Sequence, residues 1–192
     1  MKIFLFICLA VILNAESTYD RALQYLDGSK GALKEKRLVP RCPYERCDGK
    51  KIYIYVKKDL KKGYELLNKA HNEGDLRASL LALNILLKQI DYKNKNYDGY
   101  LVEKLKKDYS LDIDEYNKAV ISYMTSLALS TNNQFQCKGS FGLYEANIRA
   151  YFGINENNSK RLDVAKTNKE IALVSCKTNS LEHLKLTSKE RR

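Results

Sequence analysis

The stretch Val56–Leu83 decides the fold, and it reads V-K-K-D-L-K-K-G-Y-E-L-L-N-K-A-H-N-E-G-D-L-R-A-S-L-L-A-L. Its apolar residues recur at the i, i+3, i+4, i+7 spacing of one helix face, first over residues 60–71 and again over 76–90. Gly74 and Asp75 separate the two runs, and they suit the end of one helix and the N-cap of the next. The sequence therefore predicts two amphipathic helices joined by a tight turn.

Helical periodicity continues toward the C-terminus. Residues 113–127 predict a third strong helix with Asp112 as its cap, after a shorter pattern at Leu101 and Leu105. Residues 143–152 and 162–176 predict another helix pair, broken at 153–159. We therefore expect an all-α fold of stacked antiparallel helix pairs over residues 16–176, followed by a polar, frayed tail at 177–192.

The composition is that of a folded domain. The chain has 192 residues, of which 44% are hydrophobic and 30% charged, with nine Gly and two Pro. This length suits about one domain with a sizeable core, and the composition excludes collagen-like and low-complexity classes.

The first fifteen residues have the pattern of a secretory signal peptide. Lys2 is followed by the apolar run Ile3–Leu13, and Ala15 provides the small residue at which signal peptidase cuts. The run would span about 16 Å as a helix, against about 30 Å of hydrocarbon in a bilayer, so it is too short to serve as an anchor. We expect an exported protein, periplasmic or secreted, without a transmembrane anchor.

The cysteines point to disulfides rather than to a metal. Removal of the signal peptide would leave Cys42, Cys47, Cys137 and Cys176, and an even number in an exported chain favours two bridges. Their spacing does not match that of zinc ligands, so no metal site is expected. In the last antiparallel helix pair, Cys137 is placed just before the first helix and Cys176 at the end of the second. Cys137–Cys176 is therefore the preferred pair, and Cys42–Cys47 follows by elimination.

The region from Lys36 to Lys58 interrupts the helical pattern. It holds both prolines, two cysteines and the alternating run Ile52–Val56. Such a run suits a short strand, but a single strand needs a partner. We interpret the region as an extended loop that a Cys42–Cys47 bridge tightens.

The net charge of +11 suggests the kind of partner. The basic residues are scattered along the chain and are not interleaved with aromatic residues, which is typical of a solvated basic surface. The functional alternative is attraction to an acidic partner or an anionic envelope polymer. Export separates the chain from nucleic acid, so we expect no nucleic-acid partner.

No motif for catalysis or for a cofactor is present. The sequence lacks H-E-x-x-H, G-x-S-x-G, a P-loop and G-x-G-x-x-G, so no catalytic residue and no cofactor is assigned. His71 lies on the apolar side of its predicted helix, which favours a structural role, and His183 falls in the polar tail. Asp112, Asp114 and Glu115 could supply paired carboxylates for glycoside hydrolysis, although negative charge is also favoured at the start of a helix.

The stretch from residue 56 to 83 resembles one Sel1-like repeat, a relative of the tetratricopeptide repeats. The residues that carry the resemblance are Asp59, Lys62, Gly63, Leu67, Lys69, Ala70, Gly74, Asp75 and Ala78. Gly63 stands where the family usually has Ala, and a weaker similarity lies at 146–177. The resemblance implies an interaction scaffold that binds another protein on a concave helical surface.

These observations predict an exported protein–protein interaction module whose partner is an acidic protein of the cell envelope. The expected contact loops are 50–58 and 91–100. Their candidate contact residues are Tyr53, Tyr55, Lys57, Lys58, Tyr92, Tyr97 and Tyr100. Two alternatives remain open: an immunity or inhibitor protein against an envelope-acting toxin or hydrolase, and an envelope hydrolase acting on peptidoglycan or β-lactams.

Overall fold

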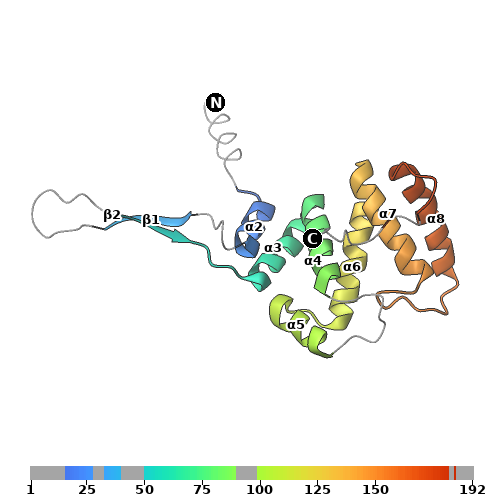
Figure 1. Ribbon diagram of the computed structural model, residues 1–192, viewed down its shortest axis with the longest axis horizontal. Coiled ribbons are helices and arrows are strands. Elements are labelled where there is room, and N and C mark those ends of the chain that lie inside the picture. The colour runs from blue at the N-terminus through green and yellow to red at the C-terminus, as the bar shows by residue number, and fades with distance from the viewer. Residues whose placement is uncertain (1–15, 28–32, 40–49, 90–98, 182–183, 185–192) are drawn as a thin grey trace, which may run out of the picture. The chain divides into compact units, whose positions relative to one another are not determined.

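The computed structural model describes residues 16–27, 33–39, 50–89, 99–181 and 184, which form seven α-helices and one two-stranded sheet (Figure 1). The elements are α2 (Thr18–Asp27), β1 (Leu33–Val39), β2 (Lys50–Tyr55), α3 (Leu60–Asn72), α4 (Leu76–Gln89), α5 (Gly99–Tyr109), α6 (Ile113–Ala128), α7 (Asn133–Ile148) and α8 (Lys160–Ser175). The chain divides into two compact units, residues 1–66 and 67–192, and α3 crosses the division. The helical class predicted from the sequence is confirmed, with a small sheet added in the first unit.

In the first unit, α2 packs against the start of α3. A Cβ atom added to Gly63 would lie 2.7 Å from Cγ of Leu26, so a glycine at this position lets the two helices approach closely. The backbone N–H of Asp59 donates to the carbonyl oxygen of Tyr25 at 2.9 Å. The helix α2 was not among the elements predicted from the sequence.

The predicted extended loop is instead largely a β-hairpin. Strand β1 pairs with β2 in antiparallel register, with Leu38 opposite Lys51 and Arg37 opposite Ile52. The prediction of a loop at 36–39 and 50–55 is therefore wrong, because β1 supplies the partner strand that Ile52–Val56 was thought to lack. Cys42 and Cys47, and hence their predicted bridge, lie outside the described residues.

The turn between α3 and α4 has the predicted geometry. Gly74 adopts φ +90°, which only glycine adopts at little cost, and the N–H of Asp75 donates to the carbonyl oxygen of Ala70 at 2.9 Å. The carboxylate of Asp75 accepts from the N–H of Arg77 at 2.9 Å and so caps α4. Both predicted caps are confirmed.

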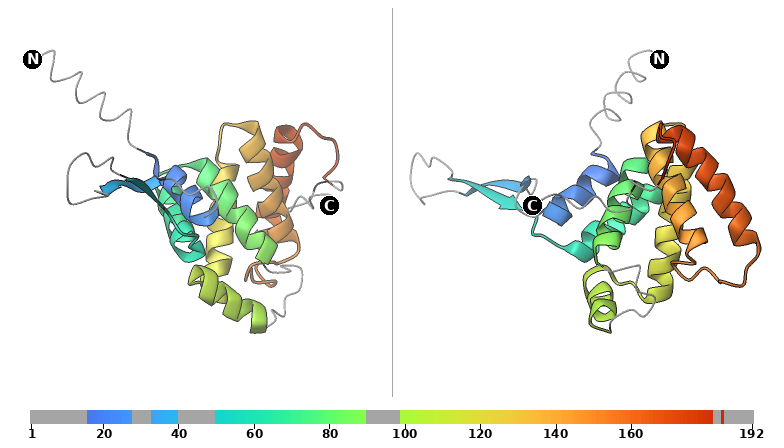
Figure 2. Two further views of the ribbon diagram at one scale, coloured as in Figure 1. Left: turned by 60° about the vertical axis from the view of Figure 1, so that its left-hand side comes forward. Right: turned by 45° about the vertical axis from the view of Figure 1, so that its right-hand side comes forward.

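Helix α6 is the central helix of the second unit. It packs against α4 and against α7, and Tyr116, Val120, Tyr123, Met124 and Leu127 are completely buried along it. Burial of this apolar face removes five large side chains from water, each worth roughly 1.5–3 kcal/mol. Figure 2 shows α7 between α6 and α8 in both views.

Helices α6 and α7 touch through their backbones at Gly139. A Cβ atom at Gly139 would lie 2.2 Å from the amide nitrogen of Ala128 and 2.6 Å from the carbonyl oxygen of Met124. At Gly142 the nearest atoms belong only to the flexible side chain of Met124, at 3.0 Å. Gly139 therefore sets how closely the two helices can approach.

The last two helices form a pair closed by a disulfide. Cys137 and Cys176 are bonded, as predicted, with their Cα atoms 4.8 Å apart. The predicted start of the first helix at residue 143 is wrong, since α7 begins at Asn133 and contains Cys137. The predicted end at residue 152 is also late, because α7 ends at Ile148.

Arg161 closes the connection between α7 and α8. Its guanidinium donates to the carbonyl oxygen of Asn147 at 2.7 Å, to that of Ile148 at 3.2 Å and to that of Glu156 at 3.0 Å. Carbonyl groups at the end of a helix have no partner within the helix, so this side chain serves as a C-terminal cap. Beyond α8, Leu181 is buried, within the segment predicted as a polar tail.

Candidate functional site

The positive charge of the chain is concentrated in residues 33–62, which we call the basic segment. This segment contains eleven Lys and Arg against four Asp and Glu, so it carries +7 of the total net charge of +11. Its described part consists of the hairpin β1–β2 and the start of α3. The prediction that the basic residues are scattered therefore overlooks this concentration, which a running count of charge along the sequence would reveal.

Three lysines at the end of the basic segment have no neutralising carboxylate among the residues that the structure describes. Lys57, Lys58 and Lys61 are exposed, and none forms an ion pair with a carboxylate of the described residues. Asp59 is engaged as a helix cap, because its carboxylate accepts from the N–H of Lys62 at 2.9 Å. The three exposed ammonium groups can therefore attract an acidic surface.

The candidate contact residues fall into different parts of the structure. Tyr53 and Tyr55 lie on β2, opposite Lys36 and Leu33 in the register, and belong to the first unit with Lys57 and Lys58. Tyr100, at the start of α5 in the second unit, is 71% exposed. Tyr92 and Tyr97 lie outside the described residues.

His71 is held in a hydrogen-bonded and aromatic cluster. Its Nδ1 lies 2.8 Å from Oγ of Ser79 and its Nε2 lies 3.1 Å from Oγ of Ser122, while its ring meets that of Tyr123 edge-on at 4.7 Å. The Ser79 hydroxyl donates to the carbonyl oxygen of Asp75 at 3.4 Å, so we assign the ring proton to Nδ1 and the acceptor role to Nε2. Burial lowers the pKa of His71, which keeps the ring neutral at neutral pH. The ring is half-buried and in contact with its neighbours, in agreement with the predicted position of His71 on the apolar side of its helix.

The Ser122–His71 pair has the components of a nucleophile and a base, but its setting favours a structural link. Ser122 lies in the middle of α6, where each backbone N–H donates to a carbonyl group one turn earlier. Backbone donors directed at a developing oxyanion usually supply the largest part of acyl-transfer catalysis, and a mid-helix serine lacks them. We therefore interpret the pair as a bridge between α3 and α6.

The acidic residues at the start of α6 mainly serve that helix. Asp112 accepts from the N–H of Glu115 at 2.8 Å, and Glu115 accepts from the N–H of Asp112 at 2.9 Å, which makes a capping box. Two of the three carboxylates considered for glycoside hydrolysis are thus engaged in the cap. The third, Asp114, faces a pocket.

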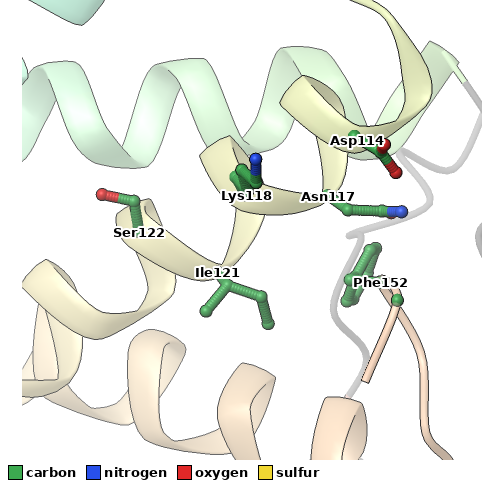
Figure 3. A pocket seen from close by; sticks show the side chains of 7 residues that line it. Asp114, Asn117, Lys118, Ile121, Ser122 and Phe152 are labelled. Carbon is green, nitrogen blue, oxygen red and sulfur yellow. The ribbon is translucent and has the colours of Figure 1, made fainter. Parts of the chain in front are cut away.

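This pocket lies along one face of α6 and has a volume of about 410 Å³ (Figure 3). Its lining residues are Asp114, Asn117, Lys118, Ile121, Ser122, Phe152 and Gly153. Five of them come from α6, at the spacing that brings residues onto one helix face. The other two come from the segment after α7, so the pocket depends on the tertiary fold and was missed by sequence reasoning.

The segment that closes the pocket has an unusual backbone. Ala150 has φ +52°, Phe152 φ +56° and Gly153 φ +71°. Left-handed conformations are costly for residues with a side chain and recur near ligand-binding sites. A Cβ atom at Gly153 would lie 3.3 Å from Nδ2 of Asn117, so the glycine also keeps this wall close to α6.

Within the part of the chain that the structure describes, no group of three or more His, Cys, Asp or Glu is arranged to hold a metal ion. No helix in that part has both the length and the apolar character needed to cross a membrane. Comparisons of the chain with family models, curated proteins and solved structures give no match.

Proposed function

We propose that this chain is an exported protein–protein interaction module that binds an acidic protein through the basic segment. The observation that carries the proposal is the net charge of +7 on residues 33–62. Such a concentration of one sign accelerates encounter with an oppositely charged surface and selects against basic partners.

The β1–β2 hairpin adds uncovered strand edges to the charge of the basic segment. Strands β1 and β2 form a sheet of two strands, so each has an edge that no third described strand covers. Unpaired strand edges accept an extended segment of a partner through backbone hydrogen bonds. An acidic extended segment would add these hydrogen bonds to the attraction of the lysines.

The α3–α4 pair supports the Sel1-like part of the proposal. Its glycine turn and the buried Ala70 and Ala78 permit the close helix approach that such repeats require. We propose that this pair is a single Sel1-like repeat and that the other helices of the second unit cover its flanks. An inhibitor or immunity protein would be a special form of the same function, with an acidic enzyme cleft as the partner surface.

The test compares two triple variants that change the formal charge equally. Lys57→Glu/Lys58→Glu/Lys61→Glu alters the basic segment, and Lys160→Glu/Lys166→Glu/Lys169→Glu alters exposed lysines of α8. The mature oxidised chain and both variants are used to capture partners from envelope extract at low and high salt, followed by mass spectrometry. We expect one salt-sensitive protein that the α8 variant retains and the basic-segment variant loses.

Other outcomes would contradict the proposal. Equal loss in both variants would mean that net charge matters and that the basic segment does not. Capture of sacculi or anionic lipid vesicles without a stoichiometric protein would replace the protein partner by an envelope polymer or a membrane surface. N-terminal sequencing of the chain from the producing cell tests export, with cleavage after Ala15 as the expected result.

A further inference from the structure

The pocket on α6 carries two opposite charges that are not neutralised by each other. Asp114 and Lys118 are one helical turn apart on the same face, with a rise of about 6 Å between them. Both are exposed, and neither forms an ion pair or a hydrogen bond with another described side chain. In Figure 3 their side chains extend in different directions from the helix.

The remaining wall of the pocket combines the polar side chains of Asn117 and Ser122 with an apolar part formed by Ile121 and Phe152. Phe152 is 4% exposed, and its ring is held by Tyr116 at 6.3 Å and Tyr151 at 6.2 Å between ring centroids. Ile121 lies beside it on α6, as Figure 3 shows. A volume of about 410 Å³ is near the lower end of the range for small-molecule sites, which fits a ligand smaller than a typical drug.

From this arrangement we propose that the pocket binds a small zwitterion with an apolar side chain, namely an apolar amino acid or a dipeptide built from such residues. The carboxylate of Asp114 receives the ligand's ammonium group, and the ammonium group of Lys118 receives its carboxylate. The apolar side chain of the ligand packs on Ile121 and Phe152. Nothing in this proposal depends on the basic segment, so it stands or fails separately from the proposed function.

Ligands with only one kind of charge fit less well. A simple anion would pair with Lys118 but would be repelled by the carboxylate of Asp114 one turn away. A simple cation would pair with Asp114 but would be repelled by the ammonium group of Lys118. A metal ion would find a single carboxylate, which is fewer anionic ligands than divalent cations take in proteins. A zwitterion alone satisfies both groups, and its apolar side chain also uses the part of the wall formed by Ile121 and Phe152.

Titration calorimetry on the full chain provides the test, with four probes that separate the parts of the ligand. L-leucine carries both charges, N-acetyl-L-leucine lacks the ammonium group, L-leucinol lacks the carboxylate, and L-leucyl-L-leucine is the dipeptide. We expect saturable binding of L-leucine or of the dipeptide, about three- to tenfold tighter than that of either singly charged probe. Whichever of the two zwitterions binds more tightly shows whether the pocket prefers an amino acid or a dipeptide.

Two variants assign each charge to its residue. Asp114→Asn should weaken the binding of L-leucine and of L-leucinol. It should leave the binding of N-acetyl-L-leucine unchanged, because that probe has no ammonium group to pair with Asp114. Lys118→Met should weaken the binding of L-leucine and of N-acetyl-L-leucine and leave the binding of L-leucinol unchanged. Asp163→Asn and Lys166→Met, at exposed positions of α8, are matched controls that should bind every probe as the parent does.

Two results would overturn the proposal. One is no saturable heat for either zwitterion at concentrations up to about 10 mM, which corresponds to the weakest affinities of interest. The other is binding that Asp114→Asn and Lys118→Met leave unchanged, which would place the ligand elsewhere. Because both side chains are exposed, we expect both variants to fold, so weaker binding cannot be ascribed to unfolding. Circular dichroism of each variant verifies this.

Discussion

The helical region from α6 to α8 and the basic segment differ in their charge and in the contacts that hold them. Residues 113–176 contain seven Lys and Arg against six Asp and Glu, whereas residues 33–62 contain eleven against four. The helical region is held by a buried apolar face, a backbone contact at Gly139 and a disulfide. The contrast teaches that the contacts that hold the fold and the concentration of positive charge lie in separate parts of the chain, so each can be changed by itself.

Among tests of this contrast, removal of the disulfide is expected to change the free energy of unfolding most. The double variant Cys137→Ser/Cys176→Ser opens a loop with a sequence separation of 39 residues. Chain-entropy arguments give a loss of about 4 kcal/mol in the free energy of unfolding for a loop of this size. Urea unfolding followed by circular dichroism should show this loss. A midpoint equal to that of the parent would mean that the bond adds nothing to the packing of α7 on α8.

A somewhat smaller effect is expected at the contact between α6 and α7. Gly139→Ala places a methyl group 2.2 Å from a backbone nitrogen, which cannot move unless the helices separate, so we expect a loss of about 3 kcal/mol. Gly142→Ala meets only the adaptable side chain of Met124 and should cost about 1 kcal/mol or less. Thermal unfolding of the two variants makes the comparison. Equal losses would show that the helices are not in backbone contact at Gly139.

The smallest predicted effect is the pH dependence from His71. Burial lowers its pKa in the folded state, so the unfolded chain takes up this proton first as the pH falls below about 6.5. The resulting loss of stability on acidification should be weaker in His71→Gln and unchanged in His183→Gln. Urea midpoints measured from neutral to mildly acidic pH provide the check. A parent whose stability rises over this range would contradict the assigned neutral ring.

Local signals explain which elements of the fold could be predicted. Gly74, Asp75 and Asp112 act through neighbours within a few residues, so their caps could be predicted from the sequence and are found in the structure. The pair Cys137–Cys176 followed from the antiparallel order of two helices. The start of α7 was missed because its buried face is built from Gly139, Ser140 and Gly142, small residues typical of turns, which are selected here by close contact with α6.

Non-local contacts explain the rest. The segment Leu33–Val39 has the sequence L-K-E-K-R-L-V, which lacks a clear apolar alternation, and it forms a strand because β2 lies beside it. The pocket brings Phe152 to Asn117 from 35 positions away, and the hydrogen bond of His71 reaches Ser122 across 51 positions. These contacts depend on how the helices pack, so no local sequence pattern predicts them.

The bond between Cys137 and Cys176 closes a covalent ring that contains most of α7, all of α8 and the connection between them, which is exposed at residues 155–160. A protease that cuts once within residues 155–160 would open this ring without releasing a fragment. The nicked chain would keep its mass in a non-reducing gel and fall into two pieces only after reduction. A protein built in this way can lose a peptide bond in the exposed connection between α7 and α8 and still keep the two helices joined.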